Sequence, residues 1–310
     1  MKRILFITAL ALALFFQVPA FAEDNTEFLN IGFHKLTDAE PEQQIRNIFQ
    51  NYQKYSNSKN LSGFLNLHDD SYYSSDGYGK DRLKELVQES WKDYPGVKYR
   101  VKIMSVDVDV DNATVIAKER LYGNTDFTVE YVKGYGFIDS ESTTIYYLKR
   151  FSNEWRITSD FIVNEKNSIR YGLAKYIPMR LDAPALIGPD EDYTAILKLN
   201  IPKSYLALIS INNEPITYPL QKSTEVFRSL KPTGIQERIL HSNDGTKNEN
   251  AVASIGIAKP NIKDSNINVN IVGIAFLSSR VNVVKHKIET PVQKTETNTE
   301  AKADIAGGKK

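Results

Sequence analysis

The stretch that decides the fold reads Tyr147-Leu148-Lys149-Arg150-Phe151-Ser152-Asn153-Glu154-Trp155-Arg156-Ile157. Strand-forming residues lie on both sides of Ser152-Asn153, which is the pattern of two antiparallel strands joined by a tight turn. Trp155 has the same parity as Ile157 and Phe161, so we expect these three side chains to face the core. The stretch therefore predicts a β-hairpin with one buried face.

Three helices are predicted before this hairpin. Apolar residues recur at helical spacing from Ile45 to Tyr55, and a short second helix is expected at about 61–67. The third helix is expected from Lys80 to Asp93, because Pro95-Gly96 follows it directly. Their apolar stripes need a sheet to cover them.

The sheet is predicted to begin after the third helix and to bend. The apolar alternation that starts at Val97 changes parity at Met104-Ser105, as a β-bulge would produce. Asp111-Asn112 then predicts a tight turn into a returning strand. Bent strands allow an open sheet to wrap around helices. The fold class expected here is an α+β cone, with helices against a curved antiparallel sheet.

From Ile45 to Ile162 the chain thus has three helices, an Asp69-Asp70-Ser71-Tyr72-Tyr73 segment and bent antiparallel strands. This succession resembles the nuclear transport factor 2-like (SnoaL-like) superfamily over residues about 40–165. The resemblance implies a cone-shaped domain with a pocket. Some members of the superfamily catalyse reactions in that pocket, and many only bind or assemble.

A second unit is expected at residues 176–285, after a linker near 167–176. Short strands alternate there with turn clusters such as Gly188-Pro189-Asp190 and Ser242-Asn243-Asp244-Gly245. Strands of this length and spacing predict an all-β, immunoglobulin-like sandwich. This region resembles no particular family.

Both ends of the chain differ from these two units. Lys2-Arg3, the apolar run 4–18 and Pro19-Ala20-Phe21-Ala22 have the order of a signal peptide, which predicts residues 1–22 as a cleaved leader. Export to the periplasm or the medium follows, with no membrane span after cleavage. Residues 286–310 have few apolar side chains, so we expect a disordered tail.

Composition excludes several classes of function. The chain has no cysteine, which excludes disulfides and thiolate metal sites. Its formal charge is +1 and becomes −1 without Lys2 and Arg3, which gives no electrostatic case for nucleic acid as a partner. No phosphate-loop or dinucleotide motif is present, and we expect no cofactor.

Candidate catalytic residues come from the resemblance to the ketosteroid isomerase branch of the superfamily. It implies that Tyr52 lies at the position of the oxyanion tyrosine. The general base is implied near Ser75 and Asp76, and Tyr147 stands where the branch has a second acid. Asp160 is the ionisable residue on the last strand. Each has a plainer reading, as a core tyrosine, a turn aspartate or an ion-pair partner.

Aromatic side chains with polar tips give the candidate ligand-binding set Tyr52, Tyr72, Trp91 and Tyr147. His68 precedes Asp69-Asp70, but a single helix end cannot make these three groups converge on one ion. No metal site is therefore predicted.

The function predicted from these features is an exported, non-catalytic binding or assembly protein whose cone holds a small apolar ligand or a partner segment. Two alternatives remain. One is an enzyme of the isomerase, dehydratase or cyclase type that uses the same pocket. The other is a structural envelope protein whose cone is filled by its own side chains. A homodimer is compatible with all three.

Overall fold

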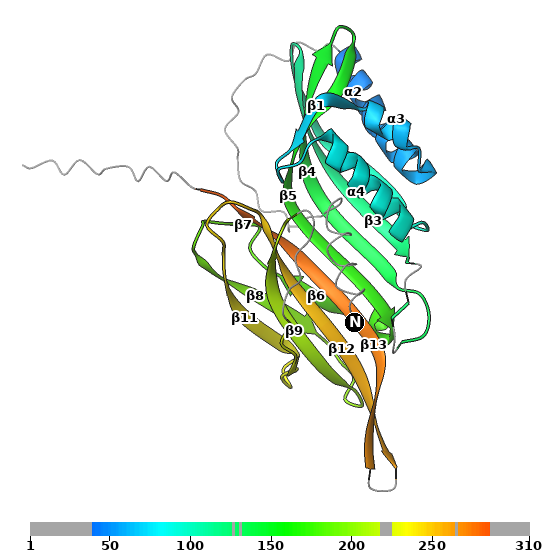
Figure 1. Cartoon of the computed structure of the whole chain (residues 1–310), viewed down its shortest axis with the longest axis vertical. Coiled ribbons are helices and arrows are strands. Elements are labelled where there is room, and N and C mark those ends of the chain that lie inside the picture. Colours follow the sequence, from blue (N-terminus) through cyan, green and yellow to red (C-terminus); the bar gives the residue numbers. More distant parts are fainter. Residues whose placement is uncertain (1–38, 126–127, 130–131, 218–224, 264–265, 286–310) are drawn as a thin grey trace, which may run out of the picture.

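The computed structural model describes residues 39–125, 128–129, 132–217, 225–263 and 266–285 (Figure 1). The leader expected at 1–22 and the tail expected at 286–310 lie outside the described residues. Across the described ranges, no helix has the length and apolar character needed to cross a membrane.

The three predicted helices are present. They are α2 (Ala39–Ser58), α3 (Leu61–Asn66) and α4 (Lys80–Asp93). The side chains of Ile45, Phe49 and Tyr52 are buried on one face of α2, as the helical spacing predicts. The Asn60 side chain caps α3 by accepting a hydrogen bond from the Gly63 amide at 3.0 Å.

The helices pack against a curved antiparallel sheet (Figure 1). Its strands are β2 (Lys98–Asp109), β3 (Asn112–Asn124), β4 (Phe137–Phe151) and β5 (Glu154–Gly172). The pairing of β2 with β3 shifts register between Ile103 and Ser105, which confirms the predicted bulge. The predicted hairpin is β4 and β5. Strand β1 (His68–Ser74) was not predicted, and it pairs in parallel with β5.

The regular secondary structure in the rest of the described chain is strand, apart from one short helix. It contains a short 3-10 helix (Leu173–Tyr176) and the strands β6 (Met179–Asp182), β7 (Leu186–Ile187), β8 (Asp192–Leu199), β9 (Leu206–Pro215), β10 (Arg228–Ser229), β11 (Ile235–His241), β12 (Glu249–Lys263) and β13 (Asn266–Val283).

The two regions share one sheet, which the sequence did not predict. The order β10-β9-β12-β13-β5-β4-β3-β2 is continuous, because β13 pairs with β5 from Gly273↔Gly172 to Ser279↔Lys166. The linker expected near 167–176 is therefore wrong for residues 167–172, which form the end of β5. The side chains of Asn167, Ile169 and Tyr171 are buried there, so this segment is structural core.

A separate small sheet, in the order β11-β8-β6, forms the second layer. Leu181 in β6, Leu197 in β8, Ile209 in β9 and Ile255 in β12 belong to the single buried core between this sheet and the long one. The region is thus all-β and two-layered. An immunoglobulin-like sandwich is not confirmed, because one of the two layers is an extension of the cone's own sheet.

Candidate functional site

The inner face of the cone carries a buried carboxyl group that sequence reasoning missed. Glu119 lies on β3, and the Tyr146 hydroxyl on β4 donates a 2.5 Å hydrogen bond to its Oε1 atom. Both side chains are buried. Burial raises the pKa of Glu119 to about 8, although the Tyr146 hydrogen bond acts to lower it. Glu119 is therefore predominantly a neutral acid at pH 7.

Asp160 on β5 lies beside this group. Its Oδ2 atom accepts a hydrogen bond from the Tyr72 hydroxyl at 2.8 Å, and its Oδ1 atom accepts one from Ser74 Oγ at 2.7 Å. Both donors lie on β1, whose register brings Ser74 opposite Asp160. Loss of hydration raises the pKa of Asp160, and the two hydroxyl donors oppose that shift. Each carboxylate oxygen thus already has a protein partner.

Aromatic rings fill the space between the helices and these strands. The Tyr52 ring centroid lies 4.9 Å from that of Phe64 and 6.1 Å from that of Tyr146. Phe49 contacts Tyr146 edge to face at 5.0 Å. Ring pairs at these separations are ordinary core contacts that exclude water. The cone is closed by its own side chains at the position of Tyr52.

His68 belongs to this packed group. Its ring lies 5.0 Å from those of Phe64 and Tyr72, and its Nδ1 atom is 3.1 Å from the Phe64 carbonyl oxygen. Burial lowers the pKa of His68 to about 4, so the ring is neutral at physiological pH. Among the residues that the structure describes, no group of three or more His, Cys, Asp or Glu side chains could hold a metal ion.

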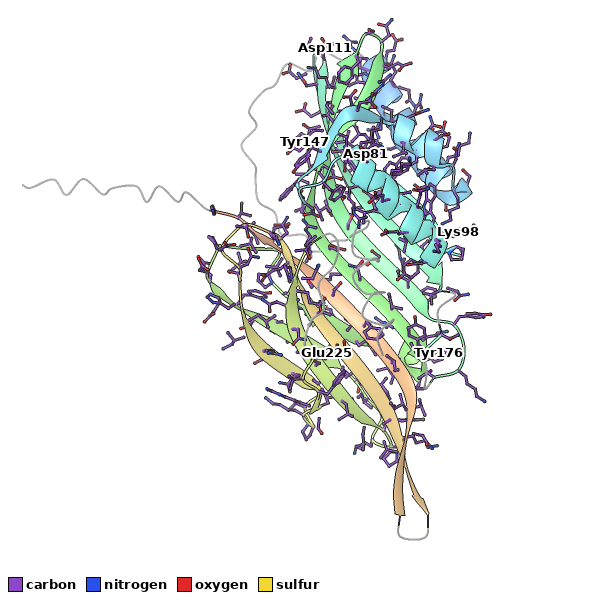
Figure 2. The ribbon with its side chains drawn as sticks, in the orientation of Figure 1. Asp81, Lys98, Asp111, Tyr147, Tyr176 and Glu225 are labelled. Carbon is purple, nitrogen blue, oxygen red and sulfur yellow. The ribbon has the colours of Figure 1, made fainter. Side chains whose placement is uncertain are left out.

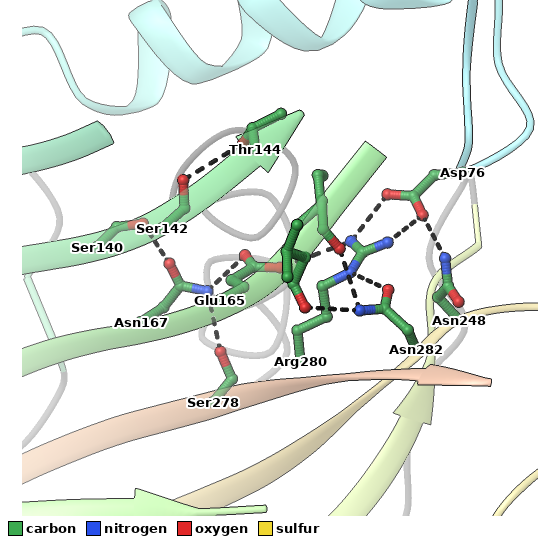
Figure 3. Close-up of polar contacts among 12 residues, drawn as sticks. Asp76, Ser140, Ser142, Thr144, Glu165, Asn167, Asn248, Ser278, Arg280 and Asn282 are labelled. Atoms are coloured by element: carbon green, nitrogen blue, oxygen red, sulfur yellow. Dashed lines mark hydrogen bonds and ion pairs between the residues drawn. The ribbon is translucent and has the colours of Figure 1, made fainter. Parts of the chain in front are cut away.

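A buried ion pair joins the cone to the second region. Arg280 on β13 and Asp76, in the turn after β1, form a bidentate pair with Nη2–Oδ1 at 2.5 Å and Nη1–Oδ2 at 2.9 Å (Figure 3). The Arg280 side chain is fully buried and that of Asp76 is nearly so. Asn248 Nδ2 donates a further hydrogen bond to Asp76 Oδ1 at 2.9 Å. Arg280 lowers the pKa of Asp76 against the opposing effect of burial. The negative charge of Asp76 in the cone is thus paired with the positive charge of Arg280 in the second region.

Polar contacts continue from Arg280 across the sheet (Figure 3). Glu165 Oε2 lies 3.8 Å from Arg280 Nη1, and Asn167 donates to Glu165 Oε1 at 2.7 Å. Asn167 also donates to Ser278 Oγ at 3.1 Å and accepts a hydrogen bond from Ser140. Burial raises the pKa of Glu165 to about 8, and the Arg280 charge opposes it. A row of hydrogen-bonded polar side chains therefore crosses strands β4, β5 and β13.

The structure separates the residues that sequence reasoning grouped together. Tyr52, Tyr72 and Asp160 lie inside the cone, and Trp91 is half-buried at its edge, where its ring meets that of Phe64 at 6.1 Å.

Two candidates lie elsewhere. Asp76 lies in the ion pair with Arg280. Tyr147 is 43% exposed on the opposite face of β4 from Tyr146, since successive side chains of a strand alternate (Figure 2). It does not contribute to the cone interior.

Sequence reasoning missed three buried ionisable residues of these two clusters, Glu119, Glu165 and Arg280. Glu119 had a readable signal, because it shares parity with the apolar residues Val115, Ala117 and Leu121 of the same strand. Glu165 and Arg280 had a weaker signal, because Glu165 was expected at the end of the cone domain and Arg280 in the second unit, with no strand pairing between them. Their partners lie more than a hundred residues away in the chain.

We expect the free energy of unfolding to fall between about pH 6.5 and 8. Glu119 and Glu165 ionise near pH 4.5 when unfolded and near 8 when folded, so the stability they contribute is full below 4.5 and is lost as the pH rises through 8. His68 acts in the opposite sense, but only below about 6.5. Replacing Glu119→Gln should remove roughly half of the loss, about 1–2 kcal/mol. Urea titrations at several pH values measure it.

The matched control is Glu154→Gln on the same sheet, whose side chain is 72% exposed. That variant should retain the wild-type dependence on pH. If Glu119→Gln and Glu154→Gln gave the same slope as the wild type, Glu119 would have to be ionised or hydrated in the native state.

Comparison with known proteins finds solved structures that resemble part of the chain. No family model and no curated protein matches the chain. A conserved protein from Planctomyces limnophilus is 9% identical, with 39% of this chain and 94% of that one covered and a TM-score of 0.35. A putative scytalone dehydratase from Novosphingobium aromaticivorans is 14% identical, with 40% and 84% covered and a TM-score of 0.34. Hexachlorocyclohexane dehydrochlorinase LinA-type3 from Novosphingobium barchaimii is 12% identical, with 40% and 87% covered and a TM-score of 0.34.

At these identities and TM-scores the likeness supports no statement about activity or ligand. The nuclear transport factor 2-like arrangement expected for residues about 40–165 is confirmed in the chain's own geometry, by helices α2 to α4 packed on the curved sheet of β2 to β5. The remaining described residues have no family assigned.

Proposed function

We propose that this chain is a non-catalytic binding or assembly protein. One observation carries the proposal: both candidate carboxylates have both oxygens engaged by protein donors. Asp76 is held by Arg280 and Asn248, and Asp160 by Tyr72 and Ser74. A general base must reach the proton that it removes, and neither group has an oxygen without a protein partner for that purpose.

The filled interior supports the same proposal. Tyr52 is buried against Phe49, Phe64 and Tyr146, so an oxyanion would have to displace packed rings to reach its hydroxyl. The cone then acts as a rigid support. A filled cone is also compatible with a structural envelope protein, whose partner would be another component of the cell envelope.

An enzyme is retained as the second candidate because of Glu119. A buried carboxyl group with a pKa of about 8, hydrogen-bonded to a tyrosine, is the type of acid that isomerases use. Glu119 and Tyr52 would then replace Asp76 as the reacting groups. Substrate binding would then have to displace the aromatic rings that pack against Tyr52.

An isomerase assay on a β,γ-unsaturated ketone distinguishes these functions. We expect no turnover above the buffer rate for the wild-type chain. Should turnover occur, and fall by roughly a hundredfold or more in Tyr52→Phe and Glu119→Gln but not in Tyr147→Phe, the enzyme would replace our proposal. Tyr147→Phe is the matched control because its hydroxyl lies on the outer face of the same sheet.

Export is part of the proposal and is supported by the leader pattern at 2–22, which lies outside the described residues. The mature protein would begin at Glu23. N-terminal sequencing of the protein isolated from the periplasm or the medium tests this; a membrane-bound chain that keeps Lys2-Arg3 would contradict it.

A further inference from the structure

A groove lies in the second region, outside the cone's aromatic core. It has a volume of about 1310 Å³ and lies at the end where β8 stops at Leu199 and β9 starts at Leu206, beside the projecting β12–β13 hairpin (Figure 1). Pockets for drug-sized ligands are roughly 300–1,000 Å³. The volume of this groove is therefore large enough for more than a compact polar molecule.

The groove is cationic. Its lining contains five basic residues and no Asp or Glu: Arg170, Arg180, Lys198, Lys203 and Lys231. Asp182, just outside the lining, lies 2.6 Å from Arg180 and 3.8 Å from Lys198, and it also binds Lys166 at 2.7 Å. One carboxylate is thus shared by three cations. Within the part of the chain that the structure describes, no carboxylate lies within 4 Å of Lys203 or Lys231.

Arg170 adds a partly desolvated charge, and this burial lowers its pKa. Its Nη1 and Nη2 atoms donate long hydrogen bonds, 3.4 and 3.3 Å, to the carbonyl oxygens of Ile177 and Met179. Its buried Nε atom has no hydrogen-bond partner among the described residues. The Asp139 carboxylate offsets part of the cost of this burial, although Asp139 also pairs with Arg120. A guanidinium that is partly withdrawn from water favours an anion nearby.

Apolar side chains line the same groove. Met179, Leu199 and Ala207 form a buried part, and Leu206, Leu208 and Val269 are about half exposed. Exposed apolar side chains gathered in a concavity indicate a ligand surface more than isolated ones do. The lining therefore combines an apolar wall with positive charge.

From this lining we infer a second binding site for a single-chain amphiphile, an acyl chain along the apolar wall with a carboxylate or phosphate head near the basic residues. The inference goes beyond the proposed function, because it does not involve the interior of the cone and holds whether or not the cone catalyses. A neutral or cationic amphiphile would bring no counter-charge to the basic lining, and a free anion would leave the apolar wall in water. An anionic amphiphile satisfies both features.

Titration calorimetry of the full chain with palmitate tests the site. We expect saturable binding at one palmitate per chain, and binding of octanoate that is weaker by roughly a hundredfold or more because less apolar surface is buried. The neutral 16-carbon alcohol should also bind more weakly. Comparison with 1-palmitoyl lysophosphatidate shows whether the site favours a carboxylate or a phosphate head, and saturable binding of either supports it.

Two variants and two controls locate the binding. Leu208→Glu and the double variant Lys203→Glu/Lys231→Glu should each weaken palmitate binding by roughly tenfold or more. Their matched controls are Ile239→Glu, which is 70% exposed on β11 outside the groove, and Lys84→Glu on α4. Circular dichroism establishes that each variant is folded.

Three results would overturn the inference. They are the absence of saturable binding, equal weakening in the groove variants and their controls, and binding only to vesicles that contain phosphatidylglycerol. The last result would mean that the exposed apolar and basic residues contact a membrane surface and do not enclose a single molecule.

Discussion

Replacing Arg280→Met is expected to lower the free energy of unfolding by about 3–5 kcal/mol. Arg280 is only 1% exposed, and its loss would leave the buried Asp76 carboxylate without its cation. The same change removes the hydrogen bond from Arg280 Nε to Asn282 Oδ1 and the positive charge beside Glu165. Urea denaturation measures the change through its midpoint at constant slope.

A double-mutant cycle separates the energetic contribution of the ion pair from other effects of the substitutions on the contact between the cone and the second region. The double variant Asp76→Leu/Arg280→Met should be more stable than Arg280→Met alone, because no unpaired charge remains buried. The control is Arg150→Met, which breaks a partly exposed pair with Asp111 and should cost less than about 1 kcal/mol. A loss in Arg280→Met no larger than in Arg150→Met would mean that Asp76 is hydrated.

Truncating Trp155→Ala is the second large effect we expect, again about 3–5 kcal/mol. The Trp155 side chain is 5% exposed and belongs to the core under the helices, together with Ile157. Its Nε1 atom is buried without a hydrogen-bond partner among the described residues, so its removal also relieves a small penalty. We therefore expect a cost near the lower end of this range.

Two companions to Trp155→Ala make the result specific. Trp155→Phe keeps an aromatic ring and discards the unpaired donor, so it should cost clearly less. Tyr176→Ala removes a side chain that is 81% exposed and should change the stability by about 0.5 kcal/mol or less (Figure 2). Equal melting temperatures for Trp155→Ala and Tyr176→Ala would contradict the assignment of Trp155 to the core.

Local patterns predicted the local structure of the cone. Helix α4 spans Lys80–Asp93 as predicted, because its apolar spacing and the following Pro95-Gly96 are both visible in sequence. The bulge before Ser105 and the hairpin at Ser152-Asn153 were also readable, since a parity change and a turn are properties of neighbouring residues.

Pairing between distant segments could not be predicted in this way. Strand β1 has two adjacent aspartates and no apolar alternation, and it forms only because β5 offers it a partner some ninety residues away. The pairing of β5 with β13 is likewise determined by tertiary structure and not by the local sequence. A segment from Asn167 to Gly172 that resembles a linker becomes core once β13 covers its free edge.

The candidate site was predicted in part. Helix periodicity predicted the inward face of Tyr52. Asp160 has the opposite parity to Trp155 and Ile157. It reaches the interior because the pairing of β4 with β5 shifts register between Tyr147 and Leu148. The partner of Asp76 is 204 positions away, and no local pattern could indicate it. Glu119 could have been predicted as a site residue, because it is an ionisable side chain on the strand face whose other residues are apolar.

Native mass spectrometry of the full protein, purified without detergent from its own host, tests the central claim that this is a binding or assembly protein. We predict a mass above that of the mature polypeptide, with the excess released on collisional activation as a bound molecule or partner chain. A bare polypeptide mass in repeated preparations, with no excess mass at any collision energy, would contradict the claim.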